Sequence, residues 1–319
     1  MNDLSITAAI IAKNVEDTLS ETINSIPPFC SQIILVDTGS DDSTPFIASK
    51  LGAEVYFYNW NDDFSDARNF SLKFARKEWV FIIDTDEILD VSSLQNNLAF
   101  FNDESIGGIN VMIKNYLDDN LEQFSTHRYT RIFRNHPKIK FSGRIHEQIR
   151  DSIENTGLKI IESDILIYHF GYNQTDKSKK FRNLEILQQE SDKSQNDFYL
   201  KYHLASTEFS LKNFENSKKI FEEIVDSKLL SIEQNEMSKI RLAQINLSEN
   251  NLNNAENWLN FQSEDDNREG FRQFILAAIK LSQQEYETAR MLYSNDKVIN
   301  SSLVDKNIIQ EANKLFSLM

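Results

Sequence analysis

The first half of the chain alternates apolar runs with amphipathic stretches. Four apolar runs have the length of buried strands, at residues 6–12, 32–37, 54–60 and 79–84. Three segments between them are predicted to be helices, at residues 16–26, 42–52 and 64–75. In the first of these, Leu19, Ile23 and Ile26 follow one another at spacings of four and three, the period of one helix face. Strands that alternate with helices predict right-handed crossovers and a parallel sheet covered on both faces.

The second half repeats one pattern of small and apolar residues. Three segments align, at residues 213–224, 251–261 and 285–294. Each has a small residue (Ser217, Ala255, Ala289) and, four positions later, an apolar one (Phe221, Leu259, Tyr293). Thirteen residues before each small residue, a leucine is followed by an alanine, at 204–205, 242–243 and 276–277. The small residues recur after 38 and then 34 positions, which resembles the tetratricopeptide repeat, a helix pair that stacks into a solenoid.

Glycine and proline divide the chain into two regions. Seven of the eight glycines and all four prolines precede residue 172, so turns are frequent in the first region and rare in the second. We place the boundary near residues 172–178, which gives domains at 1–175 and 176–319. The predicted fold is an α/β domain with a mostly parallel sheet, followed by an all-α helical-repeat domain with a closing helix near 300–316.

Composition restricts the class of protein. With 40% hydrophobic and 26% charged residues, the chain has enough apolar side chains for packed cores, so wholesale disorder is excluded. The formal charge of −15 disfavours nucleic acid as a partner, because an acidic surface repels phosphates. No apolar run is long enough to span a membrane. Asp3 and Lys13 break up the apolar run that a signal peptide would need near the N-terminus, so we expect a cytoplasmic protein. A single cysteine, Cys30, excludes an intramolecular disulfide.

Polar residues gather where the predicted strands end. Ligands of parallel α/β sheets bind beyond the carboxyl ends of the strands, which makes these residues candidates for a site. Three clusters stand there: Lys13, Asn14 and Glu16; residues 37–41; and residues 84–87. Two carboxylates one residue apart, Asp84 and Asp86, can reach one hard cation and through it a diphosphate. An exposed acidic turn is the alternative interpretation.

Seven short motifs follow one another in the first region. They are IIAKNVED (10–17), ILVDTGSDDST (34–44), FSDARNFSL (64–72), FIIDTDEIL (81–89), RIFRN (131–135), FSGRIHEQI (141–149) and YHFGY (168–172). In this order they resemble the family 2 glycosyltransferases of glycosyltransferase-A fold, over residues 4–173. The resemblance is strongest to bacterial members with tetratricopeptide-like repeats after the transferase, which are related to lipopolysaccharide-core glucosyltransferases and peptide S- and O-glycosyltransferases.

The resemblance implies a nucleotide-sugar site and transfers roles to matching positions. Ala12, Asn14 and Glu16 would line the nucleoside pocket, with Glu16 at the ribose. Asp37 would accept from a base N–H, a contact suited to uracil and hence to a UDP-sugar donor. The rest of the nucleotide site would come from Asp66, Arg68, Asn69, Asp84, Thr85 and Arg131.

The resemblance also implies a divalent cation and a general base. Asp86 would bind Mn²⁺ or Mg²⁺ directly, Asp84 would touch ribose or a metal-bound water, and His169 would be a further ligand of metal or diphosphate. Members of this type invert the sugar, with a base that takes the acceptor's proton. We favour Glu147 over His146 as that base, since inverting members generally use a carboxylate here.

Several of these residues also have purely structural interpretations. These are Asp37 and Asp41 as caps of a helix that starts near Ser43, Arg68 as the surface partner of Asp66, and His169 as a core histidine. Outside the motifs, the residues read as ordinary are His127, His136, His203 and the strand arginine Arg128.

The sequence leaves the acceptor and the use of the repeats open. The acceptor is a protein or peptide side chain, or a glycan or glycolipid, and the repeats recruit it or pair two chains into a homodimer. Two rival functions are a scaffold with a decayed transferase domain and a phosphatase of haloacid-dehalogenase type. That phosphatase class has Gly and then Thr or Val where Glu87 and Ile88 stand, so the transferase is preferred.

Overall fold

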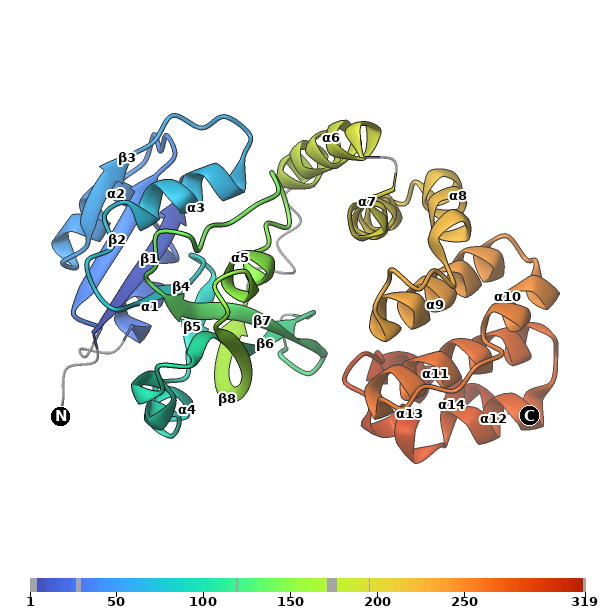
Figure 1. Cartoon of the computed structure of the whole chain (residues 1–319). Coiled ribbons are helices and arrows are strands. Elements are labelled where there is room, and N and C mark those ends of the chain that lie inside the picture. The colour runs from blue at the N-terminus through green and yellow to red at the C-terminus, as the bar shows by residue number, and fades with distance from the viewer. Residues whose placement is uncertain (1–4, 27–29, 119, 171–176, 195, 318–319) are drawn as a thin grey trace. The chain divides into compact units, whose positions relative to one another are not determined.

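A computed structural model describes residues 5–26, 30–118, 120–170, 177–194 and 196–317. The chain divides into two compact units, residues 1–174 and 175–319, and Figure 1 shows strands in the first and helices throughout the second. The motif residues Gly171 and Tyr172 and the expected domain boundary lie outside the described residues. Each unit is described by itself below.

The first unit is built on one eight-stranded sheet. Its strands are β1 (Ile6–Ala12), β2 (Gln32–Asp37), β3 (Glu54–Phe57), β4 (Trp79–Ile82), β5 (Glu87–Leu89), β6 (Ile106–Tyr116), β7 (Phe124–Arg134) and β8 (Lys159–His169). They lie in the order β3-β2-β1-β4-β7-β6-β8-β5. β1 to β4 pair in parallel as predicted, β6 pairs in parallel with β8, and the three other pairings are antiparallel. The sheet is therefore mixed.

Helices cover both faces of this sheet, as the alternating pattern predicted. The helices are α1 (Leu19–Ser25), α2 (Thr44–Lys50), α3 (Phe64–Leu72), α4 (Val91–Gln95) and α5 (Arg150–Glu154), with a 3-10 turn, η1 (Leu98–Asn102). Side chains alternate between faces along β4: Trp79 and Phe81 join the core under α1, α2 and α4, while Val80 and Ile82 join the core that includes α5. This period of two is what a strand buried on both faces requires.

The third predicted strand is shorter than expected. β3 ends at Phe57 rather than at residue 60. The chain turns there because Tyr58 and Asn61 donate hydrogen bonds to Asp66 of α3, at 2.7 Å and 3.0 Å. Residues 58–61 thus connect the end of β3 to the start of α3.

The second unit consists of helices in the described residues. They are α6 (Lys177–Lys193), α7 (Phe198–Ser210), α8 (Phe214–Ile224), α9 (Ile232–Ser248), α10 (Leu252–Trp258), α11 (Asp266–Ser282), α12 (Tyr286–Tyr293), α13 (Asp296–Asn300) and α14 (Lys306–Ser317). Six of these helices pack as three pairs of sequence neighbours: α7 with α8, α9 with α10 and α11 with α12. The small residues Ser217, Ala255 and Ala289 are fully buried in the second helix of each pair. The repeated pattern therefore marks the close contacts within helix pairs.

Gly270 is a further close contact, between α11 and α13. A Cβ atom at this position would lie 2.1 Å from the backbone oxygen of Lys297. We expect Gly270→Ala to destabilise the protein by about 1–3 kcal/mol, because the backbone of α13 must move to admit the methyl group. In an unobstructed helix interior the same change would stabilise by roughly 1 kcal/mol. Urea unfolding checks the sign, and a gain in stability would contradict the contact.

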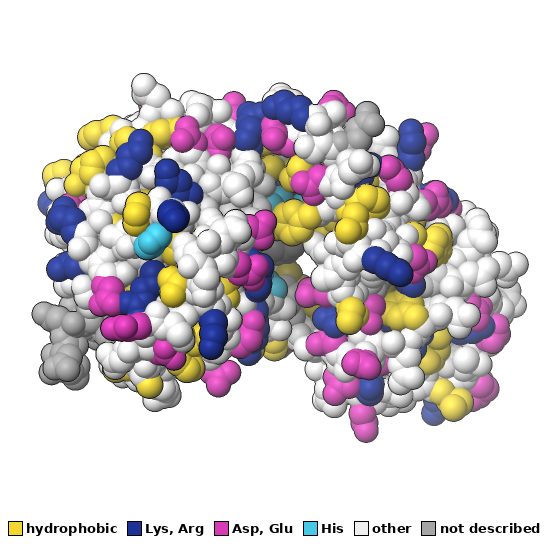
Figure 2. All heavy atoms as spheres, in the orientation of Figure 1, with side chains coloured by type: hydrophobic (Ala, Val, Ile, Leu, Met, Phe, Trp, Pro, Cys, Tyr) yellow, Lys and Arg dark blue, Asp and Glu magenta, His cyan; other side chains and the backbone are white. Residues whose placement is uncertain are grey.

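The surface carries charges of both signs. On the face shown in Figure 2, Lys and Arg side chains are interspersed with Asp and Glu, and no broad basic area is visible there. Among the described helices, none combines the length and the apolar character needed to cross a membrane.

Candidate active site

The loops after β1 and β2 are tied together by hydrogen bonds. The backbone N–H of Asn14 donates to Ser40 Oγ at 2.9 Å, and Asn14 Oδ1 accepts from the N–H of Asp41 at 2.8 Å. Glu16 Oε2 accepts from the N–H of Ser43 at 2.9 Å. Ala12, at the end of β1, accepts from the N–H of Thr38 at 2.9 Å. The predicted nucleoside-binding positions 12, 14 and 16 thus line one edge of the sheet.

Asp37 is buried at the end of β2, with only 1% of its surface exposed. Its Oδ1 accepts from the N–H groups of Gly39 and Ser40, each at 2.9 Å. Its Oδ2 has no hydrogen-bond partner among the described residues. The interpretation of Asp37 and Asp41 as helix caps is wrong, because the N-cap Ser43 of α2 receives no such bond and the N–H of Thr44 donates to Asp42. A buried acceptor without a partner is costly, which points to a ligand donor.

Helix α3 presents Arg68 to the interior and Asp66 to the surface. The predicted alternative of an Arg68–Asp66 pair is wrong: Arg68 pairs with Glu147 and Asp84, and Asp66 accepts from Tyr58 and Asn61. Asn69 bonds both backbone groups of Phe141 at 2.9 Å, so its amide fixes the loop that follows. The three motif residues of α3 therefore have different roles in the structure. Asp66 binds the segment before the helix, Arg68 pairs with buried carboxylates, and Asn69 fixes the loop at Phe141.

Five charged side chains form a chain of alternating sign beneath the strand ends. The order is Glu87, Arg131, Asp84, Arg68, Glu147. Arg131 Nη2 lies 2.6 Å from Glu87 and 2.9 Å from Asp84, and Arg68 Nη2 lies 2.8 Å from the other oxygen of Asp84. Arg131 was expected to contact a diphosphate; here it holds two carboxylates. Breaking one link of a buried pair costs about 3–5 kcal/mol, so this chain fixes the site's geometry.

The two arginines control the charge of Asp84. Burial alone would raise the pKa of Asp84, but Arg131 and Arg68 outweigh it and hold the pKa well below its usual range. Glu87 behaves differently: burial and the nearby Asp84 raise its pKa against the opposing effect of Arg131. Two donor atoms of these five charged side chains, Arg68 Nη1 and Arg131 Nε, are buried without a partner among the described residues.

Asp86 and His169 lie next to each other and are both partly exposed. Asp86 Oδ2 is 3.4 Å from His169 Nε2, and the two side chains keep 36% and 22% of their surface exposed. His169 is thus half-buried, with Asp86 on one side of its ring and Asn115 on the other. Burial lowers the pKa of His169, but the hydrogen bond and charge of Asp86 outweigh it and raise that pKa. Thr85, between the two aspartates, is half-buried.

This pair fits a divalent cation. A carboxylate oxygen and an imidazole nitrogen can share a hydrogen bond, and both atom types are also ligands of divalent cations such as Mn²⁺. Neighbouring ligands of a small octahedral cation, each about 2.1 Å from it, lie roughly 3 Å apart, close to the observed separation. Both oxygens of Asp84 face arginines, so Asp84 would act through water. Within the described residues no three His, Cys, Asp or Glu side chains converge as a metal site.

The loop after Phe141 carries both candidates for the base. It closes by reciprocal backbone bonds between Ser142 and Gln148, at 2.8 Å and 2.9 Å, and Tyr129 donates to the backbone oxygen of Glu147. His146 has a positive φ of 52°, which is uncommon for a residue with a side chain. Glu147 contacts Arg68, which also pairs with Asp84.

The structure thus brings the end of β1, Asp37, Arg68, Asp84, Asp86, Arg131, Glu147 and His169 to one region of the sheet. No role was predicted for Glu87, which stands in a motif, and the motifs did not include Asn115 and His127, although all three contact this group or its neighbours. Asn115 Oδ1 lies 2.8 Å from His169 Nδ1. Asn115 is buried between two half-buried neighbours on β6, Lys114 and Tyr116, and only its place in a strand signals an inward-facing amide.

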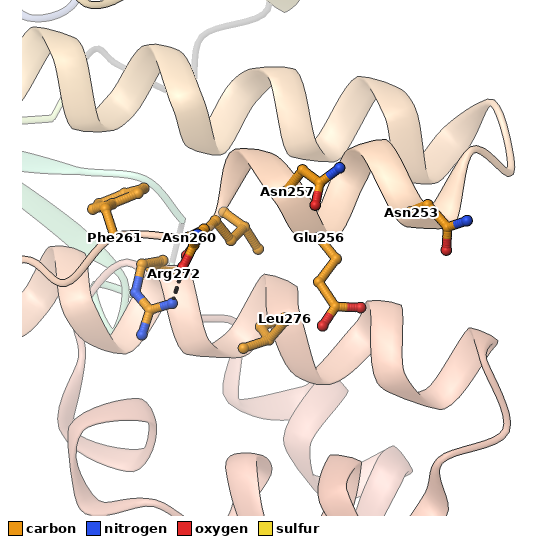
Figure 3. Close-up of a pocket in the computed structure, with 8 residues that line it drawn as sticks. Asn253, Glu256, Asn257, Asn260, Phe261, Arg272 and Leu276 are labelled. Carbon is orange, nitrogen blue, oxygen red and sulfur yellow. Dashed lines mark hydrogen bonds between the residues drawn. The ribbon is translucent and has the colours of Figure 1, made fainter.

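A separate cavity of about 450 Å³ lies in the second unit, against α10 and α11. Figure 3 shows Asn253 and Asn257 in line along α10, with Phe261 and Arg272 at one end. The charged side chains are paired, Arg272 with Glu269 and Glu256 with Lys280. The cavity therefore offers mainly amide groups with little net charge.

Known proteins resemble parts of this chain. The SPbeta prophage-derived glycosyltransferase SunS of Bacillus subtilis is 28% identical over 198 residues, 58% of this chain and 44% of that protein. A TPR repeat-containing protein of Synechococcus elongatus is 29% identical over 148 residues, 46% of this chain and 36% of its own length. The chain spans less than half of these relatives. The solved structure of S. aureus TarS has 15% identity and a TM-score of 0.43, over 91% of this chain and 55% of that one.

Membership of a family rests on a match to the family as a whole. Residues 7–174, more than half of the chain, match the family described as "Glycosyl transferase family 2". This span contains β1 to β8 and the charged chain described above. The protein belongs to glycosyl transferase family 2.

Proposed function

We propose that the protein is an inverting glycosyltransferase that moves one sugar from a UDP-sugar to an acceptor, with the help of a divalent cation. The observation that carries this proposal is the Asp86–His169 pair beside the buried Asp84, Arg68 and Glu147. A cation at the pair and a base at Glu147 supply the two activities that this reaction needs, one at the leaving group and one at the acceptor.

The donor's nucleotide is bound along the ends of β1 and β2. The free Oδ2 of Asp37 accepts from N3–H of uracil, and Glu16 lies at the ribose. Arg68 Nη1 and Arg131 Nε have unused N–H groups, which suit the oxygens of a diphosphate. The nucleotide thus completes the hydrogen bonds of three buried groups.

Asp86 and His169 hold the Mn²⁺ or Mg²⁺. When bound, this cation supplies positive charge that stabilises the departing diphosphate. Glu147 removes the proton of the acceptor as its heteroatom attacks the anomeric carbon, and Arg68 holds the Glu147 side chain in place. Attack on the face opposite the leaving group inverts the anomeric centre, so no covalent sugar–protein intermediate forms.

We propose a peptide as the acceptor, held by the cavity against α10 and α11. Asn253 and Asn257 lie one turn apart on α10, and Asn260 follows just beyond the end of that helix. One such turn rises about 6 Å, the length of roughly two residues of an extended peptide. Amide side chains match the N–H and C=O groups of such a backbone.

Incubation with a panel of nucleotide sugars and a peptide library, with and without Mn²⁺, tests the function. We expect metal-dependent transfer from a UDP-sugar, with NMR showing an inverted anomeric configuration in the product. Retention of configuration, or equal turnover after complete removal of metal, would contradict the proposal.

A substitution at Asp37 tests the choice of base. In Asp37→Asn an amide N–H replaces one acceptor and opposes uracil N3–H, so we expect UDP to bind about 10-fold more weakly or worse. CDP is expected to lose less, because cytosine N3 accepts a hydrogen bond. Calorimetry measures both ligands, with Asp41→Asn in the same loop as the control. Equal losses of affinity for UDP and CDP would show that Asp37 stabilises the loop after β2 and does not contact the base.

A further inference from the structure

A buried amide links two histidines at the ends of β6, β7 and β8. Asn115, which is 4% exposed, pairs in register with His169 on β8 and with Ser125 on β7. Asn115 Oδ1 lies 2.8 Å from His169 Nδ1, and Asn115 Nδ2 lies 2.9 Å from His127 Nδ1. The amide therefore has one histidine at its oxygen and another at its nitrogen.

The orientation of the amide decides the proton positions on both rings. With its oxygen toward His169, as here, the amide can only accept on that side, so His169 carries a proton on Nδ1. An amide nitrogen only donates, so His127 must present a lone pair at Nδ1. The neutral form of His169 then has its lone pair on Nε2, the atom that faces Asp86.

His127 is suited to the accepting role. Loss of hydration around the ring, together with the positive charges of Arg131 and His169, lowers the pKa of His127, although part of the residue remains exposed. A neutral ring keeps the lone pair that the amide requires. His127 was predicted to be ordinary, and its contact with Asn115 corrects that interpretation.

Another buried asparagine on β6 has no histidine partner within the described residues, so burial of an asparagine on this strand does not require contacts with histidines. Asn110 is also 4% exposed, and its amide donates to Glu162 and accepts from Thr130, both on neighbouring strands. Asn110 therefore connects strands away from the histidines. Asn115 has the same burial and strand, but its two ends contact ring nitrogens.

We infer that Asn115 and His127 are positioning residues that hold His169 with Nε2 available to a divalent cation. This inference rests on the proposed function for its use of the cation, but the proton positions do not depend on it. Partners that orient a ligating histidine typically change metal affinity by about 10–100-fold when removed.

The full-length protein tests the inference with two measurements. Long-range ¹H–¹⁵N NMR of histidine-labelled, metal-free protein at about pH 9 reports which nitrogen of neutral His169 carries the proton. Electron paramagnetic resonance reports the affinity for Mn²⁺. The variants are Asn115→Leu, which removes both contacts, Asn115→Asp, which keeps an acceptor for His169, and the matched control Asn110→Leu.

We expect Nδ1–H at His169 in the wild type, in Asn115→Asp and in Asn110→Leu, and a shift toward Nε2–H in Asn115→Leu. Mn²⁺ should bind roughly 10–100-fold more weakly to Asn115→Leu and within about threefold of wild type to Asn110→Leu. An unchanged Nδ1–H form of His169 in folded Asn115→Leu would overturn the inference. If Asn115→Leu does not fold, Asn115→Ala, which also removes both contacts, replaces it with the same expectations.

The two proposals fail in different ways. If wild-type protein binds no Mn²⁺ yet Asn115→Leu changes the proton position on His169, the metal part of the proposed function is lost while the positioning role stands. If wild-type protein binds Mn²⁺ and Asn115→Leu changes neither measurement, the positioning role is wrong and the proposed function stands.

Discussion

Asp86→Ala is expected to abolish metal-dependent binding of the donor and to lower transfer by about 10³-fold or more. The variant leaves His169 as a single side-chain ligand, and charge stabilisation by a cation is worth several kcal/mol at a leaving group. Because Asp86 is partly exposed and belongs to no ion pair with an arginine, the fold should survive the change.

Calorimetry of UDP with and without Mn²⁺ measures this effect, together with the transfer rate. Asp164→Ala is a suitable control, since this carboxylate is 94% exposed and its nearest cationic partner, Arg128, is 3.8 Å away. Metal-dependent UDP binding that persists in Asp86→Ala would show that the cation binds elsewhere.

Glu147→Gln has the second large expected effect, a fall in kcat of about 10²–10⁴-fold with UDP binding preserved. Glutamine has nearly the same shape and its oxygen still accepts from Arg68, but it cannot take a proton. The loss should therefore fall on the chemical step rather than on donor affinity.

His146→Gln is the comparison that separates the two candidates for the base. The positive φ of His146 is set by the loop, so glutamine meets the same backbone cost and only the imidazole is lost. We expect a smaller loss of kcat than in Glu147→Gln. The reverse order of effects would move the role of base to His146.

The first four strands and the residues after them could be predicted from the sequence for a clear reason. Each strand is a continuous apolar run, and the parallel order puts the carboxyl ends together, so Asp37 and Asp84 fall at one edge without knowledge of distant contacts. The burial of the small residues Ala255 and Ala289 could also be predicted from the sequence, because closely packed helices require small side chains at a fixed spacing.

The connections within the site could not be predicted in this way. Arg68 meets Glu147 across 79 positions of sequence, and no local pattern distinguishes that partner from Asp66 two residues away. Glu87 belongs to a cluster for which an exposed acidic turn was the alternative interpretation, yet it is buried and pairs with Arg131 from β7. These contacts depend on the antiparallel insertion of β7 beside β4, which apolar periodicity does not specify.

A crystal structure with UDP and Mn²⁺, with anomalous data at the manganese edge, measures the cation's position directly. The account predicts one manganese peak bonded to Asp86 and to Nε2 of His169, with the diphosphate on its open side. A peak bonded to neither side chain, or nucleotide bound in this region with no metal at saturating Mn²⁺, would contradict it.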